Sequence, residues 1–318
     1  MENYFIYDNH TNDIPNNITH IRTTDDFDSA LVVPHHITHI IFGRDYNQPT
    51  DCLPPTITHL TFGESYNQLT DHLPSSITHL TFGFYYNQPT HNLPSSITHL
   101  TFGYHYNQST YNLPSSITHI IFGRKYNQPT DCLPQSITHL IFDDYYNQPT
   151  DHLPSHITHL TFGVNYNQPT NNLPSSITHL TFGFCYNQQT HKLPSSITHL
   201  TFGYFYNQPT YLPSTIVHVA FGINYDRPIV FPSSISSIIL KGPWRQYEKQ
   251  LYELYNLVNT NICSFGMILH ISNNKHNLRM KSFELIDIVK DVCLMPNGSV
   301  DVSFQLLWDL WNRRLRSG

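Results

Sequence analysis

The stretch from Leu53 to His72 reads LPPTITHLTFGESYNQLTDH, and it decides the fold because it recurs with a period of twenty residues. Close copies begin at Leu73, Leu93, Leu113, Leu133, Leu153, Leu173 and Leu193. Worn copies begin at Val33 and Leu212, and degenerate copies begin at Ile14 and Phe231. A fixed period of this length is typical of solenoids, so the chain is expected to form about twelve stacked coils.

Within one copy, the segment ITHLTF (57–62) alternates between two kinds of side chain and is rich in β-branched and aromatic residues. This pattern predicts a short strand with one buried face. Leu60 and Phe62 should point into the core, and His59 and Thr61 should point outward.

Glycine ends each predicted strand, as at Gly63, where we expect positive φ or a close backbone approach. The exception, Asp143, is a residue type that tolerates the left-handed region. Two prolines within about six residues after the YNQ triplet, as at Pro49 and Pro54, exclude a helix interior, so the return path should be extended. Asn67 and its copies are expected to form a ladder of amides between neighbouring coils.

These features predict a mainly β fold, a parallel β solenoid with a C-terminal helical cap segment. A lead-in covers residues 1–13, the repeats cover 14–240 with clear copies over 33–231, and a distinct segment covers 241–318. Apolar residues recur at helical spacing in 247–258, 282–294 and 299–318. This segment either caps the open end of the solenoid or docks another protein, with Trp308 and Trp311 as anchors.

Composition excludes several classes of function. The net charge of −6, with sixteen Lys and Arg, argues against nucleic acid as a partner. No basic leader and no long apolar window is present, so we expect an intracellular protein without a membrane anchor. Five cysteines without CxxC spacing predict reduced thiols and no zinc site.

No known catalytic motif occurs, and the carboxylates are spaced by the repeat instead of being paired. We therefore expect no enzyme activity, no catalytic residues, no cofactor and no small-molecule substrate. Hydrolases and lyases built on parallel β-helices are the rival class, and they require charged residues from adjacent coils gathered in a groove.

The repeated string LPxSITHLxFGxxYNQPT, over about residues 33 to 231, resembles the FNIP repeat. This leucine-rich-repeat-like unit is found mainly in amoebae and in the large DNA viruses that infect them. The resemblance implies a protein-interaction module, often joined to an N-terminal F-box that docks onto a ubiquitin-ligase scaffold. About thirteen residues precede the first degenerate repeat, so no F-box is expected.

The resemblance also assigns the family's name-giving Asn to a structural position in each copy. The matching residues are Asn47, Asn67, Asn87, Asn107, Asn127, Asn147, Asn167, Asn187 and Asn207, with Asp226 in the last copy. The predicted function is a non-catalytic scaffold that binds another protein. A ubiquitin-ligase substrate adaptor and a purely structural protein are the alternatives.

The two residues after each strand-end glycine vary freely in charge and size, although the surrounding frame does not. A core position does not tolerate such changes, so these residues should lie exposed on a rim beside the strands. Drift of an unconstrained loop is an equal alternative to a binding role. The candidate binding residues are Arg44, Glu64, Phe84, Tyr85, Tyr104, His105, Arg124, Lys125, Tyr145, Phe184, Tyr204 and Phe205.

Histidine recurs in register and should form a column on the exposed strand face. Its members are His20, His39, His59, His79, His99, His119, His139, His159, His179, His199 and His218. Parallel imidazoles make a poor tetrahedron, so no metal site is expected. Repulsion between neighbouring imidazolium ions should lower their pKa values and weaken the fold below about pH 6.5.

Overall fold

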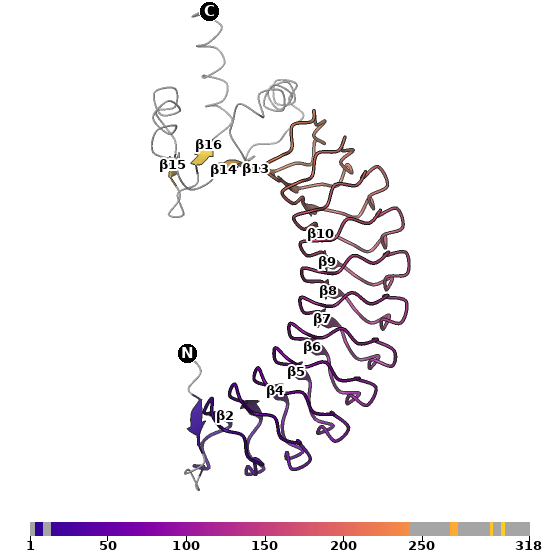
Figure 1. Cartoon of the computed structure of the whole chain (residues 1–318). Coiled ribbons are helices and arrows are strands. Elements are labelled where there is room, and N and C mark those ends of the chain that lie inside the picture. Colours follow the sequence, from indigo (N-terminus) through magenta and orange to yellow (C-terminus); the bar gives the residue numbers. More distant parts are fainter. Residues whose placement is uncertain (1–3, 9–13, 242–267, 273–292, 295–299, 303–318) are drawn as a thin grey trace, which may run out of the picture. The chain divides into compact units, whose positions relative to one another are not determined.

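The computed structural model describes residues 4–8, 14–241, 268–272, 293–294 and 300–302. The chain divides into two compact units, Met1–Tyr166 and Asn167–Gly318, each of which contains stacked coils (Figure 1). Every coil contributes one short strand, from β2 (His20–Thr23) to β13 (Ser237–Lys241). The predicted mainly β, parallel solenoid of about twelve coils is confirmed.

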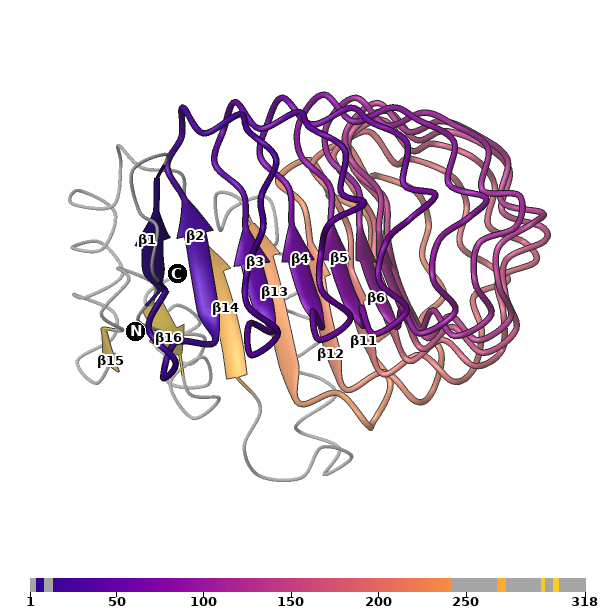
Figure 2. The same cartoon turned by 90° about the horizontal axis from the view of Figure 1, so that it is seen from below.

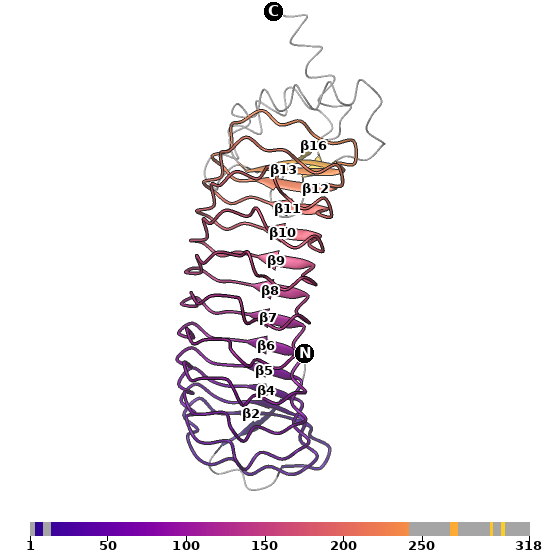
Figure 3. The same cartoon turned by 90° about the vertical axis from the view of Figure 1, so that its right-hand side faces the viewer.

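In the first unit the strands pair in parallel, each with the strand of the next coil (Figure 2). Besides β2 they are β1 (Phe5–Tyr7), β3 (His39–Ile41), β4 (His59–Thr61), β5 (His79–Thr81), β6 (His99–Thr101), β7 (His119–Ile121), β8 (His139–Ile141) and β9 (His159–Thr161). The register is that of the repeat, so that His59 lies opposite His79 and Leu60 opposite Leu80. The strands gather on one side of the coils (Figure 3).

The second unit continues the same coil pattern. Its strands are β10 (His179–Thr181), β11 (His199–Thr201), β12 (His218–Phe221), β13, β14 (Ile268–Ser272), β15 (Cys293–Leu294) and β16 (Val300–Val302). Strand β14 pairs with β13 in parallel, whereas β16 pairs antiparallel with both β14 and β15.

Strands β15 and β16 lie within the runs 282–294 and 299–318, for which the sequence predicted helices, whereas β14 lies between two predicted helical runs. Without β14, the outer edge of β13 would present unpaired backbone groups, which favours the addition of a further strand there. The helical run predicted at 247–258 and the anchors Trp308 and Trp311 lie outside the described residues. No helix in the described part of the chain has the length and apolar character needed to cross a bilayer.

The core follows the predicted alternation. Ile57, Leu60 and Phe62 are buried, as are their counterparts in the other repeats, whereas His59 and Thr61 remain partly exposed. Stacking leaves the rings of Phe62 and Phe82, for example, 5.8 Å apart. Burial of each such side chain contributes about 1.5–3 kcal/mol to the stability of the fold.

A tyrosine row that the sequence did not assign to the core completes it. Tyr106 is fully buried, and its ring stacks on Phe102 of the same coil with centroids 3.6 Å apart. Its hydroxyl lies 3.0 Å from Thr90 Oγ1, which is also buried. The other tyrosines of this row are Tyr46, Tyr66, Tyr86, Tyr126, Tyr146, Tyr166, Tyr186, Tyr206 and Tyr225. The ten coils that carry this tyrosine row therefore bury two aromatic rings each instead of one.

Close backbone approach, and not positive φ, explains the strand-end glycine. A Cβ on Gly103 would overlap the carbonyl oxygen of Gly83 in the preceding coil. Asn112, with φ 68°, is the one non-glycine residue with positive φ in the described part of the chain. The expectation that Asp143 substitutes for glycine through a left-handed conformation is therefore wrong.

Candidate functional site

The rim column consists of the two residues that follow each strand-end glycine, and its backbone continues the hydrogen-bonded ladder of the strands. The amide of Tyr85 donates to the carbonyl of Glu64 at 2.9 Å, and that of His105 donates to Phe84 at 3.0 Å. The amide of Lys125 donates to Tyr104 at 2.9 Å. Each coil thus presents its rim side chains at a fixed spacing from the next coil.

All twelve candidate binding residues of the rim reach solvent. Arg44, Glu64, Phe84, Tyr85, Arg124, Tyr145, Phe184, Tyr204 and Phe205 are exposed, and Tyr104, His105 and Lys125 are partly exposed. Phe84 and Tyr85 expose 37% and 52% of their surface, which is unusual for adjacent aromatic side chains. The geometry agrees with a rim, while a binding role for these residues remains a proposal.

In the first unit, Phe84, Tyr85, Tyr104 and His105 form one contiguous group, here called the first rim cluster. The rings of Phe84 and Tyr104 stack with centroids 4.6 Å apart, and the edge of Tyr85 meets Phe84 at 4.9 Å. His105 lies 5.1 Å from Phe84 and 5.0 Å from Tyr104. Such contacts hold exposed rings in fixed orientations, so the cluster is ordered before any partner binds.

Cations border the first rim cluster on the side of the following coil. The guanidinium of Arg124 and the ammonium of Lys125 lie 5.6 and 5.7 Å from the centre of the Tyr104 ring, within cation–π range. Arg124 is also ion-paired with Asp144. Partial burial, with the charge of Lys125 as a smaller cause, lowers the pKa of His105.

The second unit carries a similar group, the second rim cluster, made of Phe184, Tyr204 and Phe205. Phe184 stacks on Tyr204 with centroids 4.6 Å apart, and Phe205 meets Phe184 edge-on at 4.9 Å. All three side chains are exposed. Aromatic rim residues therefore occur in adjacent coils in both units.

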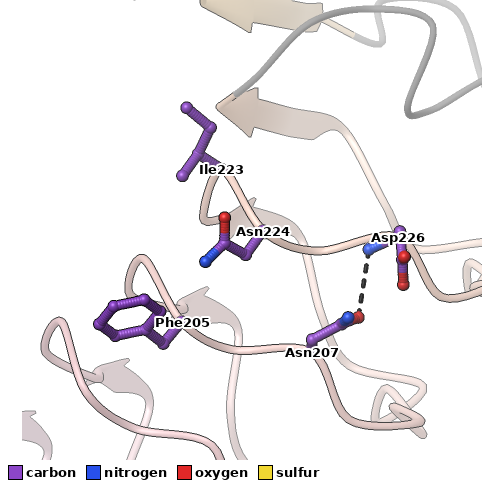
Figure 4. A pocket seen from close by; sticks show the side chains of 5 residues that line it. All are labelled: Phe205, Asn207, Ile223, Asn224 and Asp226. Carbon is purple, nitrogen blue, oxygen red and sulfur yellow. Dashed lines mark hydrogen bonds between the residues drawn. The ribbon is translucent and has the colours of Figure 1, made fainter.

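An open hollow of about 530 Å³ lies next to the second rim cluster (Figure 4). Its lining residues are Phe205, Asn207, Ile223, Asn224 and Asp226. The amide of Asp226 donates to Asn207 Oδ1 at 3.2 Å, so part of this polar wall belongs to the coil frame. The hollow brings no paired acid and base together.

The histidine column is present within each unit. Ring centroids of successive histidines are 3.9–4.2 Å apart from His20 to His159, for example 4.2 Å between His79 and His99. From His179 to His218 they are 4.1 and 4.4 Å apart. The column is half-buried instead of exposed, because each ring covers the faces of its neighbours.

Burial is the larger cause of the shifts in this column. The pKa values of His79 and His119 are lowered first by desolvation and then by neighbouring histidines such as His99. The sequence predicted repulsion alone as the cause of the lowered pKa values, because rings on an open strand face would not be desolvated. From His20 to His199, Nδ1 of each ring lies next to the preceding threonine, as in the 2.9 Å contact between Thr78 Oγ1 and His79.

The asparagine ladder is also present. Asn107 Oδ1 accepts the backbone amide of Asn127 at 2.9 Å and Nε2 of Gln128 at 3.1 Å. The glutamine that follows each asparagine thus shares in the ladder, which the sequence reasoning did not predict. In the earliest coils Asp28 takes the same role toward Asn47 and Gln48, at 2.8 and 3.0 Å.

The described residues offer little for chemistry. Within them, no group of three or more His, Cys, Asp or Glu side chains is placed to hold a metal ion. Cys52 and Cys132 are exposed, Cys185 is half-buried, and none of the three forms a disulfide. What the geometry offers is a regular frame with exposed aromatic and charged side chains on one rim.

Comparison with solved structures shows the same architecture. CroV588, described as a novel circular LRR protein structure, is 41% identical, with a TM-score of 0.67. The match covers 74% of this chain and 38% of CroV588, so this chain spans well under half of that protein. YopM from Yersinia enterocolitica WA-314 is 19% identical with a TM-score of 0.50, over 73% of this chain and 54% of YopM, and supports the fold alone.

No curated protein matches the sequence. The model of the FNIP Repeat matches residues 31–65, 46–85, 86–125, 106–144, 126–152, 146–185 and 186–224. These matches run through most of the repeats found in the sequence and confirm the resemblance noted there. The chain is an LRR-type repeat solenoid and belongs to the FNIP-repeat family.

Proposed function

We propose that the chain is a non-catalytic scaffold that binds another protein through its rim column. The observation that carries this proposal is the pair of aromatic rim clusters. Exposed rings such as Phe84 and Tyr85 stand on a backbone whose hydrogen bonds fix their spacing. Contiguous exposed apolar surface of this kind is typical of interaction sites, and aromatic side chains dominate the binding energy of protein interfaces.

The family supports the same proposal. Repeat solenoids of the LRR type commonly act as interaction scaffolds, because a stack of coils presents a long, regular surface. The partner proposed here is a protein and not nucleic acid, since the net charge of −6 opposes binding to phosphate backbones.

The test is affinity capture with the full chain and two matched variants. The first variant carries Phe84→Ser and Tyr104→Ser in the first rim cluster. The second carries Tyr211→Ser, which removes an aromatic side chain that is 72% exposed on the return path. We expect a partner protein to be retained by the wild type and by Tyr211→Ser, and to be lost from the rim variant.

Equal capture by all three proteins would contradict a binding role for the first rim cluster. Melting temperatures of the three proteins serve as the control for folding, because surface substitutions change stability by no more than about 0.5 kcal/mol. Two other functions would show in the same experiment. Capture of a ubiquitin-ligase scaffold through residues 241–318 would favour an adaptor, and self-association with no second protein would favour a structural role.

A further inference from the structure

The charges that flank the first rim cluster are opposite in sign and lie at its two ends. Along the rim of the first unit, Glu64 precedes the aromatic coils, and Arg124 and Lys125 follow them. Arg124 is ion-paired with Asp144, and Arg44 is ion-paired with the adjacent Asp45. Among the residues that the structure describes, neither Glu64 nor Lys125 takes part in an ion pair. The carboxylate of Glu64 acts on Arg44 of the preceding coil only as one of the smaller causes that raise the pKa of that guanidinium, and the ammonium of Lys125 lies over the Tyr104 ring, so both charged groups can still pair with a charge on a partner.

The distance between the acidic and the basic end of the rim matches the length of a short extended peptide. The rim from Glu64 to Lys125 spans three coil steps, and its backbone ladder keeps the coils at strand spacing, about 4.8 Å each. The two ends are therefore about 14 Å apart along the coil axis. An extended peptide advances about 3.4 Å per residue, so residues four apart are separated by about 14 Å as well.

In an extended peptide, the side chains that point to one face also fit the distance of about 14 Å between Glu64 and Lys125. Residues i, i+2 and i+4 of such a peptide point to one face. When residue i lies beside Glu64, residue i+4 lies beside Lys125, and residue i+2 lies over the stacked rings of Phe84 and Tyr104. The rim thus offers an acidic end, an apolar platform and a basic end at the pitch of a β-strand.

We propose that the first rim cluster binds an extended segment of a partner protein that carries a basic, an apolar and an acidic side chain at positions i, i+2 and i+4. The segment has either chain direction, since only its charge order relative to Glu64 and Lys125 is set by the rim. This inference rests on the proposed protein-binding function and adds the chemistry of the segment recognised.

The test measures binding of three labelled peptides to the full chain by fluorescence anisotropy at low ionic strength. The peptides contain Lys-Ser-Leu-Ser-Glu, Lys-Ser-Leu-Ser-Lys or Glu-Ser-Leu-Ser-Glu. We expect the mixed peptide to bind about two- to fivefold more tightly than either like-charged peptide, the range for one exposed charge contact. Salt at about 0.5 M should remove most of this preference.

A charge reversal in the protein tests the assignment of the basic end. With Lys125→Glu both ends of the rim are acidic, so the preference should move to the peptide with two lysines. The double variant Phe84→Ser and Tyr104→Ser should weaken the binding of all three peptides by at least about tenfold, the effect of losing a central aromatic contact. Tyr211→Ser, on the return path and outside both rim clusters, is the matched control and should leave the charge preference unchanged.

Equal affinity of the three peptides, no measurable binding by any of them, or a preference that Lys125→Glu does not move would each overturn this inference. If such a result occurs while capture of a partner still depends on Phe84 and Tyr104, the proposed function stands and only the segment chemistry is wrong. If capture is also insensitive to those two substitutions, both proposals fall.

Discussion

Tyr104 and Tyr106 lie two residues apart in one turn, yet Tyr104 belongs to the rim and Tyr106 to the buried core. Tyr106 is fully buried and stacks on Phe102 with centroids 3.6 Å apart. Tyr104 is partly exposed, stacks on Phe84 of the preceding coil and has Arg124 over its ring. The place of a residue within the coil, and not its type, decides whether it belongs to the frame or to the surface.

The turn explains how these two regions stay separate. At the start of the turn, the backbone of Gly103 lies directly against that of Gly83 in the preceding coil. At its end, the side chain of Tyr106 is buried in the core. The two residues between them have their backbone fixed, whereas their side chains point to solvent. Variation at the rim therefore leaves the core packing unchanged.

The sharpest test of this comparison is a pair of alanine substitutions. Tyr106→Ala removes a buried ring and should lower the free energy of unfolding by about 3–5 kcal/mol. Tyr104→Ala removes a partly exposed ring of the rim and should change the free energy of unfolding by about 0.5 kcal/mol. Urea unfolding of both variants and the wild type measures the difference. Similar losses for the two variants would contradict the separation of frame and rim.

The asparagine ladder should contribute less than the aromatic core. Asn107→Ala leaves the amide of Asn127 without its acceptor, whereas Gln128 Nε2 keeps the backbone carbonyl of residue 107, and the substitution should cost about 1 kcal/mol. Asn107→Asp retains an acceptor oxygen, as Asp28 does in the native chain, and is expected to be close to neutral. A thermal-melt comparison in which Asp and Ala cost the same would show that the acceptor is not what stabilises the turn.

The histidine column should have a smaller effect that appears only in acid. The pKa values of His79 and His119 are lower in the folded chain than the unfolded value of 6.5. The folded state therefore binds fewer protons than the unfolded state, so these groups have no effect well above pH 6.5 and destabilise the fold as pH falls below it. Repulsion from the neighbouring His59, His99 and His159 contributes to the lowering of these two pKa values, after desolvation.

The double variant His79→Gln and His119→Gln checks this sign. Between about pH 7.5 and 5 its melting temperature should fall less than that of the wild type, while the two proteins share their carboxylates. Coincident curves over this range would show that protonation of the column does not affect stability.

Much of this architecture could be predicted from the sequence because the same residue pattern recurs in many copies. The period of twenty predicts the coils, and the alternation in ITHLTF places Ile57, Leu60 and Phe62 in the core. The asparagine is the same in almost every copy, which predicts the ladder. The two rim residues differ from copy to copy, which predicts their exposure.

Other features depend on contacts between coils that no local pattern reveals. Tyr66 stands in the polar string YNQ, which carries no strand or helix periodicity, and its burial arises only when its ring stacks on Phe62. Burial of the histidine column likewise requires neighbouring coils. Strand β14 adds to the edge of β13 through a pairing between residues about thirty positions apart, Ser237 with Ile268.

The most direct test of the central claim, that the rim binds a protein, is site-specific photocrosslinking. A photoreactive phenylalanine analogue replaces Tyr104 in one protein and Leu69 in another, where Leu69 is 57% exposed on the return path. Both are irradiated in an extract of the cells in which the chain occurs. The account predicts a discrete covalent adduct with another protein from position 104 and none from position 69. Adducts of equal yield from both positions, or from position 69 alone, would contradict it.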